Sequence, residues 1–286
     1  MTALTVSRPR DGTRHSIRLI AAVATATVVL VGLAGCGSSS SSSNASTSDT
    51  LQQVLKNGTV RVADCISFAP FGFYDASGKA QGYDVDIANL MAQQLGVKLD
   101  LIDTTSDNRI PNLQTGKVDV VICNFTENPT RAKQINFTSP YVIAGEVLLV
   151  KANSNINGIA DLTGKTVAVV TGSTDAQIIG QANPGAKTQS YPTSAAAVLA
   201  VKSGQADAMI EDSNFLTYQA KLDPTLKVTH DSLVPLEYNG FGVAQGQLNW
   251  LQWQNQFIQW LNTSGQNRAL YKKWFGVDPA FPLPNE

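Results

Sequence analysis

Two nine-residue stretches of the chain share one pattern. Residues 116–124 read Gly-Lys-Val-Asp-Val-Val-Ile-Cys-Asn, and residues 204–212 read Gly-Gln-Ala-Asp-Ala-Met-Ile-Glu-Asp. Glycine and aspartate recur at the same spacing, and each stretch continues as an apolar run that ends in a polar residue. Such runs are typical of strands that a parallel sheet buries on both faces. The repetition predicts two equivalent α/β lobes.

The segments around both stretches alternate between strand and helix patterns. Apolar runs predict strands at 60–63, 99–102, 118–123, 166–170, 206–210 and 241–244. Helical spacing of apolar residues predicts helices at 83–95, 110–114, 193–203 and 249–261, with a final helical turn at 271–276. Gly96, Gly116 and Gly204 mark helix ends, and Thr193 is the expected N-cap of its helix. This alternation implies a mostly parallel sheet in each lobe.

The order of these elements predicts where the chain changes lobe. Residues 51–145 and 236–286 form the first lobe, and residues 146–235 form the second. The chain leaves the first lobe near 141–146 and returns near 234–240, which gives a two-strand hinge. Ligands of open parallel sheets bind beyond the carboxyl ends of the strands. Two facing lobes would therefore enclose a small ligand between their strand tips.

The first 35 residues have the features of a signal peptide. A basic segment is followed by an apolar run of 15 residues, 19–33, which is short for a membrane span of ~20 residues. The sequence Leu33-Ala34-Gly35-Cys36 resembles a bacterial lipobox, which predicts cleavage before Cys36 and lipid on its thiol. An N-terminal anchor that is never cleaved is the alternative.

Residues 36–50 are small and polar, including six consecutive serines at 38–43, so we expect a flexible tether there. The leader holds 4 of the 21 Lys and Arg residues and 1 of the 22 Asp and Glu residues. The remainder has 17 basic and 21 acidic residues, a net charge of −4 instead of −1. This balance gives no indication of nucleic-acid binding. Two histidines and three cysteines are few for a multi-ligand metal site, and neither a metal nor another cofactor is expected.

Three motifs in order along the chain resemble the family 3 bacterial solute-binding proteins. They are residues 82–95, which begin Gly-Tyr-Asp-Val-Asp-Ile, residues 124–141, from Asn-Phe-Thr to Ser-Pro-Tyr, and residues 271–276, Tyr-Lys-Lys-Trp-Phe-Gly. The resemblance extends from about Leu51 to Phe281 and implies the type II periplasmic-binding-protein fold, two α/β lobes that close on a ligand. It also implies a monomer that captures a polar amino acid and delivers it to an ABC permease of the cytoplasmic membrane. The protein is expected outside the cytoplasm, either free in the periplasm or attached to the membrane through its lipid.

The resemblance assigns ligand contacts to loops and strand tips. Arg131 matches the arginine that binds the ligand's carboxylate, since a guanidinium donates two parallel hydrogen bonds; an exposed surface arginine is the alternative. Ser173 and Thr174, which precede a helix, match the second carboxylate contact. Asp212 matches the carboxylate that binds the ligand's ammonium group. The other expected contacts are Asn124, Thr126, Phe68 as an aromatic wall, and Asp64.

Two features bear on the ligand's side chain. Arg109, in Ser-Asp-Asn-Arg-Ile-Pro at 106–111, resembles a segment with which glutamate- or aspartate-binding relatives hold a side-chain carboxylate. Glu211 would repel an acidic side chain, unless strand alternation turns Glu211 away while Asp212 points into the cleft. We expect an acidic or amide amino acid, with a cationic one as the alternative.

Some alternatives stay open at this point. Cys65 and Cys123 end neighbouring strands, and they are expected either as a disulfide at the rim of the site or as two separate thiols. A few relatives with this fold are cyclohexadienyl dehydratases, and Glu211 could act as a general acid in such an enzyme. Against this, the predicted site has no nucleophile–base pair and no histidine, because His230 lies near the hinge. A sensing module that signals to a receptor is the third function considered.

Overall fold

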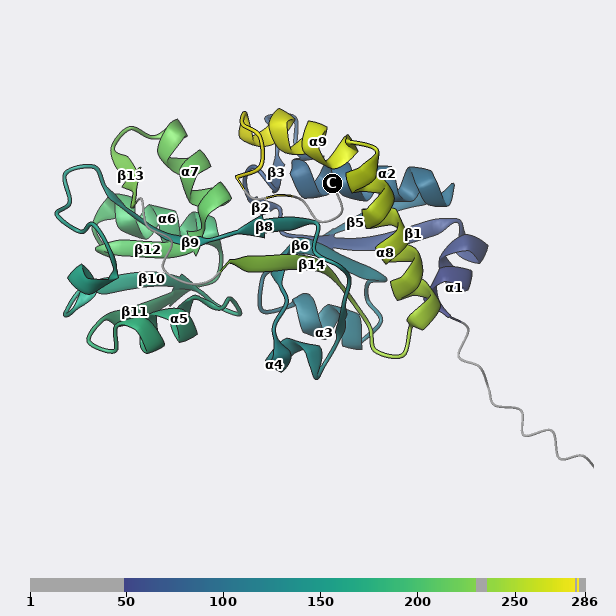
Figure 1. The fold of residues 1–286 in the computed structure, drawn as a ribbon, viewed down its shortest axis with the longest axis horizontal. Helices are drawn as coiled ribbons and strands as arrows, with labels where there is room; N and C mark the ends of the chain where they lie inside the picture. The colour runs from purple at the N-terminus through teal and green to yellow at the C-terminus, as the bar shows by residue number, and fades with distance from the viewer. Residues whose placement is uncertain (1–48, 230–235, 281, 283–286) are drawn as a thin grey trace, which may run out of the picture. The chain divides into compact units, whose positions relative to one another are not determined.

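The computed structural model describes residues 49–229, 236–280 and 282, all within the unit of the chain that spans 45–286 (Figure 1). The predicted signal peptide at 1–35, Cys36 and His230 lie outside these residues. The predicted tether to residue 50 overlaps the first helix by one residue, because Asp49 caps α1 (Thr50–Asn57) by accepting a hydrogen bond from the backbone N–H of Leu51. Within the described ranges, no helix combines the length and the apolar character that crossing a membrane requires.

The first sheet contains the first repeated stretch. Its strands follow the order β5-β1-β6-β14-β7, and β8 pairs with β14. Strand β1 is parallel to β5 and β6, whereas β14 is antiparallel to all its partners. The strands are β1 (Thr59–Asp64), β5 (Lys98–Asp103), β6 (Val120–Thr126), β7 (Asn136–Phe137), β8 (Val142–Ala144) and β14 (Glu237–Val243).

Helices lie on both faces of this sheet, with α2 and α9 on one face and α3 and α4 on the other (Figure 1). These helices are α2 (Tyr83–Leu95), α3 (Arg109–Gln114), α4 (Pro129–Ala132), α8 (Leu248–Thr263) and α9 (Gln266–Phe275). The apolar spacing predicted for α2 is confirmed, since Val85, Ala88 and Met91 are buried. A three-stranded sheet before α2 contains β2 (Ser67–Phe68), β3 (Gly72–Tyr74) and β4 (Ala80–Gln81).

The second sheet contains the second repeated stretch and follows the order β11-β10-β12-β9-β13. Strand β12, the repeated stretch, is parallel to β10 and antiparallel to β9, just as β6 is parallel to β1 and antiparallel to β14. The strands are β9 (Glu146–Lys151), β10 (Thr166–Val170), β11 (Lys187–Tyr191), β12 (Ala208–Asp212) and β13 (Leu226–Val228). The two repeated stretches therefore hold equivalent central positions, which confirms the predicted fold class.

Helix α5 covers one face of the second sheet, and α6 and α7 cover the other (Figure 1). The helical segments are η1 (Ile159–Leu162, a 3-10 turn), α5 (Asp175–Ala182), α6 (Ser194–Ser203) and α7 (Ser213–Leu222). Thr193 is the N-cap of α6, as predicted, and accepts a hydrogen bond from the backbone N–H of Ala196. We call the first sheet with its helices lobe 1 and the second sheet with its helices lobe 2.

The chain passes between the sheets at β8 and β9. Strand β8 ends in lobe 1 at Ala144, and β9 begins in lobe 2 at Glu146. The antiparallel register sets Glu146 opposite Asp212, at the carboxyl end of β12. The first residue of β9 therefore lies at the strand tips, where a ligand site is expected.

Candidate functional site

A cavity lies at the carboxyl ends of the central strands and takes its lining from both lobes. Seven of the nine predicted ligand contacts line it, namely Phe68, Arg109, Asn124, Thr126, Arg131, Ser173 and Thr174. Asp64 and Asp212 do not belong to its lining. Residues distant in the sequence are thus brought together at one site.

Arg131 is positioned by the short helix α4, whose N-cap Asn128 accepts a hydrogen bond from the backbone N–H of Arg131. Its guanidinium donates to the carbonyls of Thr126 at 2.7 Å and of Gly172, in lobe 2, at 2.9 Å. It also lies 5.1 Å from the centre of the Phe125 ring, a cation–π distance. Burial lowers the pKa of Arg131, but an arginine remains charged at neutral pH. These two bonds use two of its five N–H donors.

Arg109 has a different environment, although it lies over the same ring at 4.2 Å. It donates four hydrogen bonds, all to backbone carbonyls: those of Ser106, Cys123, Asn124 and Gly172. Burial, and then the neighbouring charge of Arg131, lower its pKa to about 9. These bonds leave one N–H donor, so Arg109 holds the cavity wall together and is poorly placed to grip a carboxylate with two bonds.

The guanidiniums of Arg109 and Arg131 both donate a hydrogen bond to the carbonyl of Gly172, in the loop before α5. Gly172 has a φ of 84°, and a Cβ at this position would lie 2.5 Å from the backbone N and Cα of Asp107 in lobe 1. A residue with a side chain would be strained at this φ and would also clash with the facing loop. The close approach of the two lobes here therefore requires glycine.

Other contacts also join the lobes around the cavity. The hydroxyls of Thr126 and Thr174 each donate to one carboxylate oxygen of Glu237, at 2.9 and 3.1 Å. Asn124, which has a φ of 38°, donates from its side chain to Asp212 at 3.1 Å. Phe68 stacks on Phe215 of α7 with ring centres 4.3 Å apart, so the expected aromatic wall also packs against the other lobe.

Glu211 and Asp212, the last two residues of β12, have different surroundings. Glu211 lines the cavity, whereas the Asp212 carboxylate caps α7 by accepting hydrogen bonds from the backbone N–H groups of Asn214 and Phe215. The physical reason is that α7 begins directly after β12, and its free N–H groups attract the carboxylate. Burial raises the pKa of Asp212 to about 7.

Asp64 and Ser173, two of the predicted ligand contacts, differ in their relation to the cavity. Asp64 is fully buried beneath β3, where neither carboxylate oxygen has a hydrogen-bond partner and burial raises its pKa well above the usual range. The Ser173 hydroxyl lines the cavity but closes its own turn, since it donates to the Val170 carbonyl and accepts from the N–H of Asp175.

Sequence reasoning missed three acidic residues of the cavity wall: Glu146, Asp175 and Glu237. For two of them, a nearby sequence feature could have indicated a place at the site. Glu146 directly precedes the apolar run 147–150, and Asp175 follows the Gly-Ser-Thr stretch already assigned to the site. Glu237 begins β14 at the return to lobe 1, where the sequence holds no pattern that marks it.

Carboxyl groups outnumber guanidiniums around the cavity. Its charged lining within the described residues consists of Arg109, Arg131 and four acidic residues, Glu146, Asp175, Glu211 and Glu237. Burial raises the pKa of Asp175 to about 6. Burial, followed by the charge of Asp175, raises the pKa values of Glu146 and Glu211 well above their usual range. Burial at this cavity therefore favours the neutral form of each of these three carboxyl groups more than water does.

These pKa values predict that the ligand-free protein loses stability as the pH rises from 5 to 8. Asp175 and Asp212 titrate at about 6 and about 7 in the folded state, above the ~3.9 of an unfolded aspartate. The folded state binds more protons in this window, so the stabilisation is complete below pH ~4 and is lost as the pH rises through 6 to 7. For Asp212 the whole effect is at most ~4 kcal/mol, of which ~2.7 kcal/mol, or ~5–11 °C in melting temperature, falls between pH 5 and pH 8.

Thermal denaturation at pH 5 and pH 8, at fixed ionic strength, measures this loss. Asp212→Asn cannot titrate and is expected to reduce the difference between the two melting temperatures. A melting temperature of the unmodified protein that is equal or higher at pH 8 would contradict the raised pKa values.

Cys65 and Cys123 form a disulfide with a Cα–Cα distance of 5.2 Å, and both line the cavity. Of the two alternatives, the structure thus contains the bonded one. The disulfide ties the residue that follows β1 to the middle of β6, which continues past Cys123 to Thr126, and the Cys123 carbonyl accepts a hydrogen bond from Arg109.

Comparisons with known proteins agree with this architecture. The sequence profile of the bacterial extracellular solute-binding proteins, family 3, matches residues 60–277. A glutamine-binding protein of Geobacillus stearothermophilus is 35% identical over 208 residues, which cover 71% of this chain and 79% of the relative. The crystal structure of an ancestral amino acid-binding protein, a precursor of cyclohexadienyl dehydratase, has a TM-score of 0.75 at 38% identity and covers 79% of this chain and 99% of its own.

An ancestral arginine-binding protein bound to arginine is also similar, with a TM-score of 0.72, 35% identity, and coverage of 77% of this chain and 99% of its own. These neighbours share the two-lobe arrangement of sheets described above. The family profile covers more than half of the chain, from the first strand of lobe 1 to the end of the last helix. The chain belongs to family 3 of the bacterial extracellular solute-binding proteins.

Proposed function

We propose that this protein captures a free polar amino acid outside the cytoplasm and delivers it to an ABC permease. One observation carries the proposal: the buried Arg131 guanidinium, with three N–H donors left, shares a cavity with four carboxyl groups. A free amino acid carries a carboxylate and an ammonium group, and burying both is favourable only when each is paired. Arg131 supplies the partner of the carboxylate, and the acidic residues in and next to the lining, among them Asp212 beside Asn124, offer partners to positive charge on the ligand.

Closure of the lobes would accompany capture. Arg131, Asn124 and Thr126 belong to lobe 1, whereas Ser173, Thr174 and Asp212 belong to lobe 2. A ligand that contacts both sets binds the closed arrangement better than an open one, so it shifts the hinge equilibrium towards closure. We propose 51–145 with 236–286 and 146–235 as the two moving bodies, and the closed form as the one that the permease recognises.

The N-terminal segment completes the proposal. Residues 1–35 would act as a signal peptide, lipid on Cys36 would anchor the exported protein to the membrane, and the serine-rich stretch would let a monomer reach its permease. For the proposed function we expect neither a nucleic-acid partner nor a cofactor.

The sequence and the cavity favour different side chains for the ligand. An acidic or amide side chain is the expectation from the sequence, and the relatives named above include binders of glutamine and of arginine. Four carboxyl groups against two guanidiniums in the cavity disfavour an acidic side chain, because like charges at close range repel each other strongly in a buried site.

A thermal-shift screen of the full chain against the twenty amino acids tests the proposal. A ligand that binds only the folded state at 100 times its Kd adds ~2.7 kcal/mol of stability, or ~5–11 °C for a protein of this size. The control is the D-enantiomer of each amino acid that raises the melting temperature. If no amino acid raises the melting temperature at millimolar concentration, the protein does not capture free amino acids.

A dehydratase is the second candidate, since Glu211 is a buried carboxyl group with a raised pKa in the cavity. The proposal of capture without catalysis expects no turnover of prephenate or arogenate by the purified protein. Product formation that Glu211→Gln abolishes would establish the enzyme instead. A neighbouring permease and ATPase gene would separate transport from sensing.

A further inference from the structure

We propose that Glu146, Asp175 and Glu211, the carboxylate trio, form a subsite for the positively charged end of the ligand's side chain. The inference rests on the proposed function and makes it specific: the ligand is a cationic amino acid. It reverses the preference for an acidic or amide side chain that the sequence suggests.

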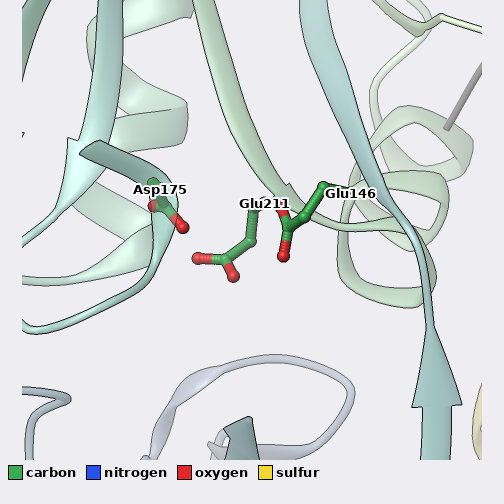
Figure 2. Close-up of side chains that lie close together, drawn as sticks. All are labelled: Glu146, Asp175 and Glu211. Atoms are coloured by element: carbon green, nitrogen blue, oxygen red, sulfur yellow. The ribbon is translucent and has the colours of Figure 1, made fainter. Parts of the chain in front are cut away.

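The three carboxyl groups come from three different elements and converge on one point. Glu146 is the first residue of β9, Asp175 is the first residue of α5, and Glu211 lies one residue before the end of β12. One oxygen from each lies within 4.8 Å of the other two (Figure 2). Figure 2 shows the carboxylate ends turned towards a common space, and all three residues line the cavity that contains Arg131.

Within the described residues, the trio has no basic partner at ion-pair distance, and one of its buried oxygens accepts no hydrogen bond. Glu146 is 2% exposed, and its Oε2 has no hydrogen-bond partner. Asp175 accepts from the backbone N–H of Val170, and Glu211 accepts from the Ser194 hydroxyl and from its neighbour's N–H. Among the residues that the structure describes, no lysine or arginine forms an ion pair with the trio. Arg109 and Arg131, the basic residues of the cavity, donate to backbone carbonyls instead.

This spacing suits an ammonium group. Charge-assisted N–H···O bonds are about 2.8 Å long, so three acceptors in tetrahedral directions around one nitrogen lie ~4.6 Å apart. The oxygens of the trio lie within 4.8 Å of one another, a limit that admits this spacing. A guanidinium also presents several donors to facing carboxylates. A divalent ion prefers oxygen ligands as well, but the two guanidiniums in the same cavity repel a dication more strongly than a singly charged group.

The trio is distinct from the expected site of the ligand's own ammonium group. The family resemblance gives that role to Asp212, whose carboxylate accepts a hydrogen bond from Asn124, a residue of the cavity lining. With the α-carboxylate on Arg131 and the α-ammonium near Asp212, the trio is left for a second positive charge. Only an amino acid with a cationic side chain carries one.

Calorimetry of the full chain with two matched ligand pairs tests this inference. L-Lysine is compared with L-norleucine, and L-arginine with L-citrulline, since each pair differs mainly in the charge. The cationic member is expected to bind at least 100-fold more tightly.

The variant Glu146→Gln is expected to weaken the binding of lysine and arginine at least 10-fold and to leave the binding of the neutral analogues unchanged. Glu211→Gln is a second variant with the same expectation, and Glu127→Gln, on the exposed surface, is the control that changes nothing.

Each other outcome overturns the inference in a recognisable way. If norleucine and citrulline bind as tightly as their partners, the trio does not recognise side-chain charge, although the proposed function stands. If Glu146→Gln weakens every amino acid equally, the trio binds the α-ammonium group. If calcium or magnesium chloride alone raises the melting temperature of the protein and Glu146→Gln removes that rise, the trio is a metal site. If no amino acid binds at all, the proposed function fails with it.

Discussion

Replacing Arg131 with alanine is expected to reduce the affinity for the amino acid at least 100-fold. The substitution leaves the ligand's carboxylate buried without its charged partner, a loss of ~3–5 kcal/mol, which corresponds to roughly 150- to 5,000-fold. Arg131 is the residue to test because its guanidinium spans Thr126 and Gly172 and keeps three donors for the ligand. Calorimetric titration of the variant and the unmodified protein with the same amino acid measures the ratio.

Two further variants separate recognition from folding. Arg131→Lys keeps the charge but loses the planar pair of donors, and we expect an intermediate affinity. Arg268→Ala removes a half-exposed guanidinium of α9 far along the chain from the site, and we expect no change in affinity. An Arg131→Ala protein that melts normally and binds within threefold of the unmodified protein would exclude Arg131 as the carboxylate partner.

The second large effect concerns the disulfide. The double variant Cys65→Ser with Cys123→Ser is expected to lose ~4 kcal/mol of stability, because the disulfide closes a loop with a sequence separation of 58 residues. For a protein of this size the loss corresponds to ~8–16 °C in melting temperature. Thermal denaturation under non-reducing conditions measures it.

Reduction supplies the matched control for this variant. A reductant is expected to lower the melting temperature of the unmodified protein to that of the double variant, and to leave the double variant unchanged. A double variant that melts within 2 °C of the unmodified protein would show that the disulfide adds little to stability. It would also remove the disulfide as the element that fixes the cavity wall near Arg109.

The elements that sequence reasoning predicted well are those whose signals are local. The helix α2 follows from its apolar spacing, and α6 from the N-cap Thr193 and the terminal Gly204. The central strands β6 and β12 follow from short apolar runs. The strand β9 and helix α7 were not predicted. Only Gly145 and Glu146 interrupt the apolar residues on either side of the β9 start, and α7 begins without a break after β12.

The acidic half of the site illustrates what local patterns leave out. Glu146 lies at the cavity because the antiparallel register of β9 with β12 sets it opposite Asp212, 66 residues further along the chain. Nothing near Glu146 in the sequence encodes that register. One oxygen of Asp212 caps α7, because the free N–H groups of a helix start attract a carboxylate, and the other oxygen accepts a hydrogen bond from Asn124 of the cavity lining. Arg131 was easier to predict from the sequence, because it belongs to a contiguous motif.

The most direct test of the account is a calorimetric titration of the full chain with each of the twenty amino acids. The account predicts that one chemical class binds in a 1:1 complex with a Kd below ~10 µM, or about −7 kcal/mol, and that lysine or arginine belongs to it. No binding tighter than millimolar by any of the twenty would contradict amino-acid capture between the two lobes.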